Sequence, residues 1–217
     1  METPGGQLLN DPRLSQRFFW FGCGLEAALG ALGGLGLLWQ GRPFAEWWQP
    51  EARAIGLGLG ATIPLLLFFH RTMTSVRGPF APLRFWLEAT VRPLMRPWTV
   101  GQIAMVSILA GVGEELLFRG AIQGWAGARW GPAAGLILAS GLFGAAHCVS
   151  LRYALLTVLV GVYLGLLMQV TGSLLAPVLT HALYDFVALV YLLRIHRPLG
   201  PPEGTEPSPP VESATPR

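Results

Sequence analysis

The sequence is poor in charge, contains no lysine and has only two cysteines. Charged residues make up 12% of its 217 residues and hydrophobic residues 52%, whereas a soluble domain carries roughly 25% charged residues. The net charge of +3 is too small and too scattered to suggest a nucleic-acid partner. Cys23 and Cys148 offer neither a disulfide framework nor a zinc-ligand spacing, and we expect both to be small packing residues in apolar stretches.

Six apolar stretches approach the length of about 20 residues that a transmembrane helix needs. They cover residues 18–39, 52–69, 99–119, 132–148, 153–170 and 173–193. The first is too long for the core of a signal peptide and no clear cleavage site follows it, so we expect it to be retained. The sequence therefore predicts an all-α fold, a polytopic transmembrane helical bundle of about six spans.

The chain divides into three parts. Residues 1–98 hold two spans and an arginine-rich stretch, 70–98, which we expect to be an interfacial amphipathic helix, with a weakly hydrophobic seventh span as the alternative. Residues 99–193 hold the other four spans. Residues 194–217 form a tail with seven prolines in its last 20 positions, and we expect it to be disordered because it cannot bury a core.

Six spans place both termini on one side of the membrane, and the arginines are divided unequally between the sides. The side of the termini carries ten: Arg13, Arg17, Arg71, Arg77, Arg84, Arg92, Arg96, Arg152, Arg194 and Arg197. The other side carries three: Arg42, Arg53 and Arg129. Because arginine is enriched in cytoplasmic loops, we expect an integral protein of the cell (inner) membrane with both termini in the cytoplasm.

Ionisable side chains at membrane depth are costly and usually functional. Seven fall within the predicted spans: Glu26, Glu114, Glu115, Arg119, His147, His181 and Asp185. Glu114 and Glu115 project about 100° apart around a helix, and Arg119 shares a face with Glu115. We therefore expect Glu115 to pair with Arg119, which leaves Glu114 free to face a cavity as a general base. A structural charge cluster between helices is the alternative.

The two histidines lie in later spans. His147 ends the fourth stretch, where a packing or capping role is the alternative to a functional one. His181 and Asp185 share one helix face, so they can hydrogen-bond and fix the imidazole tautomer, or simply join two helices as a polar pair. Glu26, amid glycine and alanine, is expected to hydrogen-bond to a neighbouring helix and is left out of the site.

Depth arithmetic predicts that these side chains meet. Glu114 and His147 each lie about 16 residues, or about 24 Å along a helix, from the break at Gly131. In an antiparallel helix pair they reach the same level. His181 and Asp185 lie about 14 and 20 Å from the next turn on that side, so one cluster forms inside the bilayer, in its cytoplasmic half.

Three segments resemble, in order, the three motifs of the CPBP family: Glu114-Glu115-xxx-Arg119, Phe143-xxx-His147 and His181-xxx-Asp185. This family comprises the CAAX-type prenyl endopeptidases and the bacteriocin-processing or immunity proteins often called Abi proteins. The resemblance covers about residues 99–193 and implies a catalytic core, an intramembrane endopeptidase of the glutamate type. It also implies that Arg119 organises the first motif by pairing with Glu115.

The resemblance further implies that Glu114 activates a water with help from His147. His181 and the residue at 185 would stabilise the oxyanion. The family usually has Asn at this last position, with Asp as a known variant. An ionised Asp185 cannot donate a hydrogen bond, so its expected role here is to orient His181.

Three alternatives stay open beside the protease. Glu114, His147 and His181 could ligate zinc with a water in the fourth place, although the chain has no His-Glu-xx-His signature. A membrane binding or immunity protein would use the fold without catalysis, and a transporter would cleave nothing. The protease hypothesis needs no cofactor, and its substrate is a membrane-embedded or membrane-anchored peptide or protein, lipidated or not.

Overall fold

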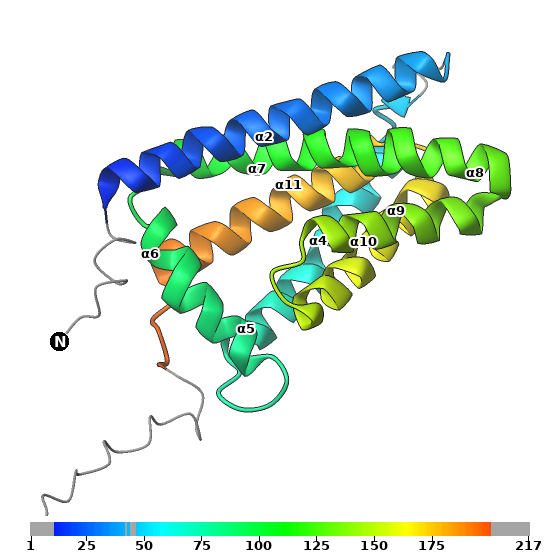
Figure 1. Ribbon diagram of the computed structural model, residues 1–217. Coiled ribbons are helices and arrows are strands. Elements are labelled where there is room, and N and C mark those ends of the chain that lie inside the picture. The colour runs from blue at the N-terminus through cyan, green and yellow to red at the C-terminus, as the bar shows by residue number, and fades with distance from the viewer. Residues whose placement is uncertain (1–10, 42, 44–46, 201–217) are drawn as a thin grey trace, which may run out of the picture.

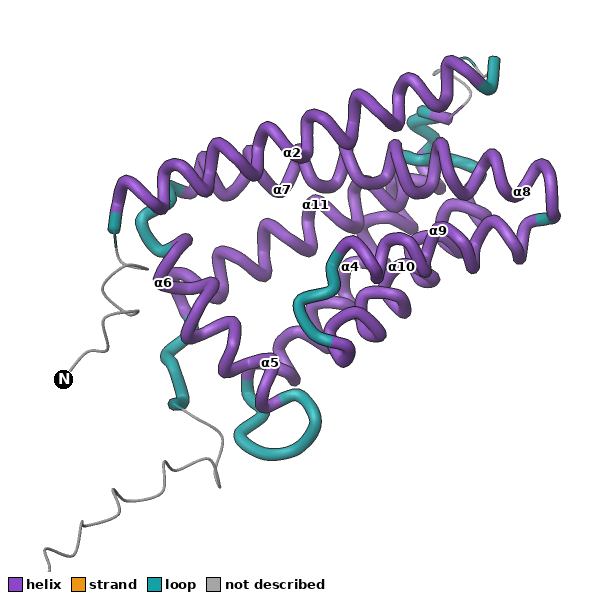
Figure 2. Tube along the Cα trace, in the orientation of Figure 1, coloured by secondary structure: helices purple, strands orange, loops and turns teal. Residues whose placement is uncertain are grey.

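The computed structural model describes residues 11–41, 43 and 47–200, and all regular structure in this part of the chain is helical (Figure 2). The first half holds α2 (Pro12–Trp39), α4 (Ala52–Met73), α5 (Ala81–Trp86), η1 (Leu87–Val91) and α6 (Arg92–Met95). The second half holds α7 (Val100–Glu115), η2 (Leu116–Gln123), α8 (Gly124–Trp130), α9 (Pro132–Ala146), α10 (Leu151–Thr171), α11 (Leu175–Val190) and η3 (Tyr191–Ile195). Residues 201–217, most of the predicted tail, lie outside the described residues.

The predicted bundle of transmembrane helices is confirmed, with one correction to the number of full spans. Among the described residues, five helices are long and apolar enough to cross a membrane: Pro12–Trp39, Ala52–Met73, Val100–Trp130, Leu151–Thr171 and Leu175–Ile195. The fourth predicted span, 132–148, is the 15-residue helix α9. At 1.5 Å per residue it is about 22 Å long, short of the roughly 30 Å of a hydrocarbon core, because the helix ends at His147.

The helix that carries the first motif continues well past it. From Val100 to Trp130 the chain is helical throughout, with a π-helical stretch, η2, in the middle. The run stops at Gly131, whose φ of +92° only glycine adopts at low cost, and Pro132 begins α9. The predicted break is therefore confirmed, and α9 returns beside α8 (Figure 1).

Helix α2 packs against α7 and η2 through glycines. A Cβ on Gly113 would lie 2.4 Å from the carbonyl oxygen of Glu26, and one on Gly33 would lie 2.5 Å from the backbone of Leu116. Helix backbones approach this closely only where small residues remove the intervening side chains. The first span is thereby held directly against the helix segment that carries Glu114 and Glu115 (Figure 1).

Gly33→Ala is expected to lower the free energy of unfolding in detergent by about 3 kcal/mol, because the new methyl group meets backbone atoms that cannot rotate away. The matched control is Gly34→Ala on the same helix, where a Cβ meets nothing within 4 Å. That change should be neutral or stabilising by about 0.5 kcal/mol. Equal thermal stability of the two variants would contradict the close packing of α2.

The arginine-rich stretch forms a helical segment, 81–95, that is not among the five spans, so a seventh span is not supported. Buried Arg84 donates to Glu88 Oε2 at 2.8 Å, and Glu88 Oε1 lies 2.7 Å from His196 Nε2. Arg92 donates to the carbonyl of Leu192. These contacts fasten the segment to the end of the last helix; an interfacial position stays a prediction.

The cysteines have different surroundings. Cys23 is buried in a cluster with Phe19 and Trp98, as expected of a packing residue. Cys148 is exposed in the short connection between α9 and α10, so the same expectation is wrong for this residue. Because α9 ends before it, Cys148 does not lie within a helix that could pack it.

Candidate active site

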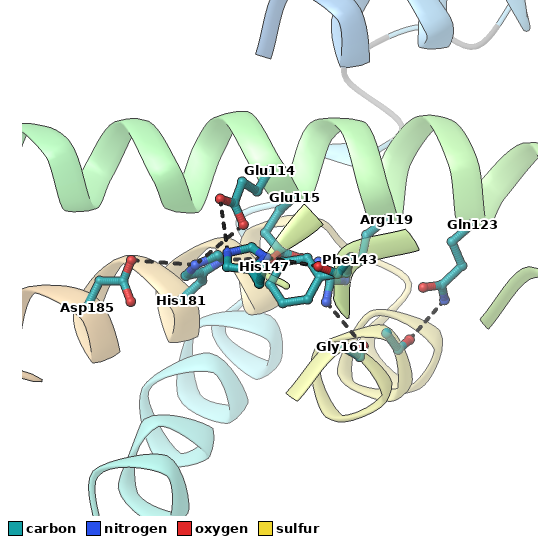
Figure 3. A network of polar contacts seen from close by, with 10 residues as sticks. Glu114, Glu115, Arg119, Gln123, Phe143, His147, Gly161, His181 and Asp185 are labelled. Atoms are coloured by element: carbon teal, nitrogen blue, oxygen red, sulfur yellow. Dashed lines mark hydrogen bonds and ion pairs between the residues drawn. The ribbon is translucent and has the colours of Figure 1, made fainter. Parts of the chain in front are cut away.

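The sequence-predicted ionisable residues of α7, η2, α9 and α11 meet in one cluster, which Figure 3 shows from close by. Glu115 is its buried centre, since its Oε1 accepts a hydrogen bond from Arg119 Nη1 at 3.0 Å and lies 2.8 Å from His181 Nδ1. Both Glu115 and Arg119 have no exposed surface. The predicted pairing of these two residues is therefore observed, and it ties α7 to α11.

Glu114 has a different environment from its neighbour. Its Oε1 lies 3.6 Å from His147 Nε2 and its Oε2 lies 4.0 Å from His181 Nε2. The whole residue is only 6% exposed, and its Oε2 is buried without a hydrogen-bond partner among the described residues. One carboxylate of the pair is thus fixed by partners, while the other stands between two imidazoles without a direct hydrogen bond to either.

His181 is surrounded by carboxylates. Because Glu115 accepts at Nδ1, that nitrogen carries a proton. Its Nε2 faces Glu114 and also Asp185, whose Oδ2 lies 3.5 Å away. Asp185 is one helical turn after His181 on α11, so the spacing alone positions the two groups side by side.

The ring of Phe143 organises the other side of the cluster. The Arg119 guanidinium lies over this ring with its Cζ 4.4 Å from the centroid, and the ring of Phe118 packs edge-on at 5.2 Å. One turn later on the same helix end, His147 Nδ1 lies 2.9 Å from the Phe143 carbonyl oxygen. When Nδ1 carries a proton, its N–H group donates to this carbonyl oxygen, and Nε2 is directed toward Glu114.

Two polar bonds join the π-helical stretch to α10. Arg119 Nη2 donates to the carbonyl of Gly161 at 3.1 Å, and Gln123 Nε2 donates to that of Gly165 at 3.0 Å. Gln123 lies one turn after Arg119, as Gly165 lies one turn after Gly161. Gln123 was not predicted from the sequence, although its position four residues after Arg119 in an apolar stretch was a usable signal.

A cavity of about 350 Å³ opens beside Glu114. Its polar lining comes from Glu26, Thr72, Glu114, His147, Tyr153, His181, Tyr184 and Asp185. Its apolar lining includes side chains of α4, of the 81–95 segment and of α11, among them Phe69, Trp86 and Leu189. A smaller hollow of about 90 Å³ shares His147, His181 and Asp185 with it. The cluster is therefore open to an occupant that is mostly apolar.

Glu26 stands in this cavity, contrary to the sequence-based prediction that left it out of the site. Its Oε2 is buried and has no hydrogen-bond partner among the described residues, so the expected bond to a neighbouring helix is not observed for this atom. The sequence does not show the depth of Glu26 relative to Glu114, because no short turn joins α2 to α7. The close approach of α2 at Gly113 sets the two at one level.

The positions of the side chains also bear on whether the site can bind a metal ion. Within residues 11–41, 43 and 47–200, no group of three or more His, Cys, Asp and Glu side chains is arranged to hold a metal ion. The residues considered as zinc ligands are Glu114, His147 and His181, and they lie near one another. A chelator experiment separates the zinc and glutamate hypotheses.

Fold and site together define a class: an integral membrane protein of packed helices with a buried glutamate–histidine cluster facing a cavity. Residues 96–187 match the family model described as Type II CAAX prenyl endopeptidase Rce1-like. This segment includes every residue from Glu114 to Asp185, so its similarity to the CAAX proteases confirms the resemblance found in the motifs. No curated protein and no solved structure matches the chain.

Proposed function

We propose that the protein is an intramembrane glutamic endopeptidase in which Glu114 activates a water molecule. The observation that carries this proposal is the position of the Glu114 carboxylate, 3.6 and 4.0 Å from two imidazole nitrogens in a cavity. These separations are too long for direct hydrogen bonds and are of a kind that a water molecule bridges. The match of residues 96–187 to the CAAX protease family model supports a protease in general.

The reaction follows from the two different carboxylates. Glu114 takes a proton from the water, whose oxygen attacks the carbonyl carbon of the scissile peptide bond. The carbonyl π electrons move to the oxygen, and His181, held by Glu115, stabilises the oxyanion through a protonated Nε2. The C–N bond then breaks, and the proton on Glu114 passes to the leaving amine. His147 orients the water, and Asp185 orients His181.

The cavity also supports a substrate class. Its lining is largely apolar, and the helices around it are those of a membrane bundle. A peptide or protein that is embedded in the bilayer, or anchored to it by a lipid, would present apolar groups to this lining. We place the protein in the cell (inner) membrane with both termini in the cytoplasm, on the basis of the arginine distribution. The short helix α9 still reverses the direction of the chain between α8 and α10 (Figure 1), so the two termini stay on one side.

The test is cleavage of fluorogenic peptides, with and without a lipid anchor, by the purified protein in detergent. We expect fragments that mass spectrometry assigns to one peptide bond, and an unchanged rate after treatment with a strong chelator. Added zinc should not increase the rate of the treated protein. Loss of cleavage in chelator that zinc restores would instead favour metal chemistry at Glu114, His147 and His181.

A further inference from the structure

The catalytic cavity holds two imidazoles, those of His147 and His181, and no arginine is among its described lining residues. Three carboxyl groups also line it, those of Glu26, Glu114 and Asp185. Two of these groups belong to the proposed catalytic cluster. Glu26 does not, because it comes from α2, which lies outside the segment 96–187 that matches the protease family.

The position of Glu26 is fixed by the backbone. Gly113, the residue before Glu114, lies so close to α2 that a Cβ there would be 2.4 Å from the Glu26 carbonyl oxygen. One turn further along α2, a Cβ on Gly30 would be 3.3 Å from the Gly113 Cα. Glu26 is therefore clamped beside the helix turn that carries Glu114, and both side chains reach the same cavity.

One carboxylate oxygen of Glu26 lacks a donor among the described residues. This oxygen, Oε2, is buried without a hydrogen-bond partner, whereas Oε1 of Glu115 has two partners in the same cluster, Arg119 and His181. A buried acceptor that stays unpaired costs free energy, and more if it is charged. A donor brought by the occupant of the cavity removes that cost, and the nearby Glu114 and Asp185 favour a donor that is positively charged.

We propose that Glu26 is a substrate-recognition residue, whose carboxylate binds a protonated amine or guanidinium carried by the substrate near the scissile bond. This inference rests on the proposed function and adds a preference to it. The preferred substrate is an otherwise apolar peptide with one lysine or arginine placed to reach α2. The apolar neighbours of that residue pack against the cavity wall, for example against Phe69, Trp86 and Leu189.

The test measures binding apart from cleavage. Glu114→Gln protein in detergent is titrated with fluorescent apolar peptides in which one lysine moves position by position, each paired with the same peptide carrying norleucine there. At one position we expect the lysine peptide to bind roughly 10- to 100-fold more tightly, as for a hydrogen bond to a charged group. Adding Glu26→Gln should reduce this ratio to about one, and adding Glu26→Asp should leave part of it.

Two controls make the result specific. Glu51→Gln, at the exposed start of α4, removes one negative charge away from the cavity and should leave the lysine preference intact. Equal gel-filtration profiles and melting temperatures show that the Glu26 variants are folded. The inference is overturned if no position of the peptide shows a lysine preference. It is also overturned if the preference survives Glu26→Gln and disappears in Asp185→Asn. Absence of cleavage by the wild-type protein overturns the proposed function, and the binding result stands apart from it.

Discussion

Replacing Glu114 with glutamine should lower kcat for peptide cleavage by about a thousandfold, within the range that a general base contributes. The amide has nearly the same size and still fits the space between His147 and His181, but it cannot accept a proton from water. KM should change little if the substrate is held by the cavity wall. The measurement is the cleavage rate of the purified variant, with melting temperature as the measure of folding.

Glu51→Gln is the matched control for this change, because it removes one carboxylate at an exposed position outside the cavity. It should cleave at the wild-type rate. A Glu114→Gln variant that is folded and cleaves as fast as the control would show that Glu114 is not the base. The assignment of Glu114 to the catalytic site would then fail, even though its carboxylate lies near His147 and His181.

Arg119→Met should be the most destabilising of the single changes considered, with a loss of about 3–5 kcal/mol in the free energy of unfolding. The guanidinium is completely buried, and its removal leaves Glu115 as a buried charge with one donor fewer. It also leaves the carbonyl of Gly161 without its side-chain donor. Arg129→Met, at an exposed position on α8, is the control and should cost less than about 1 kcal/mol.

A second substitution tests the physical cause. In the double variant Arg119→Met with Glu115→Gln, the uncompensated charge is gone, while the glutamine oxygen still accepts from His181. We expect the double variant to be more stable than Arg119→Met alone, since buried pairs interact non-additively. If the two losses simply add, the destabilisation comes from lost packing against Phe143 and not from the stranded carboxylate.

Much of the cluster was predictable because helical geometry is regular. The spacing of Glu115 and Arg119 allowed one pairing, and the structure shows it. The equal distances of Glu114 and His147 from the break at Gly131 placed the two residues at one level. In the structure Glu114 Oε1 and His147 Nε2 are 3.6 Å apart. Such arithmetic works where one turn joins two antiparallel helices, since the turn is a common origin for both depths.

The contribution of α2 was not predictable by the same means, because no short turn links it to the helix that carries Glu114. Its level is set by the contact of Gly113 with the α2 backbone, which is a tertiary feature. A signal was present in the sequence, since Gly22, Glu26 and Gly30 recur every four residues on one face. Small residues at this spacing mark a helix packing face, and Glu26 lies on it.

The length of α9 was overestimated for a related reason. Apolar residues continue past His147 with Cys148 and Val149, but the helix ends at Ala146 and His147 caps it. Apolar composition alone does not show where a helix stops inside a bundle. The early end matters, because it allows His147 Nδ1 to approach the Phe143 carbonyl while Nε2 faces Glu114.

The central claim is that Glu114 directs water to a peptide bond, and cleavage in heavy-oxygen water tests it most directly. Wild-type protein and Glu114→Gln are incubated with a lipid-anchored peptide in the presence of a strong chelator, and both fragments are weighed by mass spectrometry. We expect one heavy oxygen on the new carboxyl terminus with the wild type, and no fragments above background with the variant. Labelled fragments in equal yield from a folded Glu114→Gln protein would contradict it.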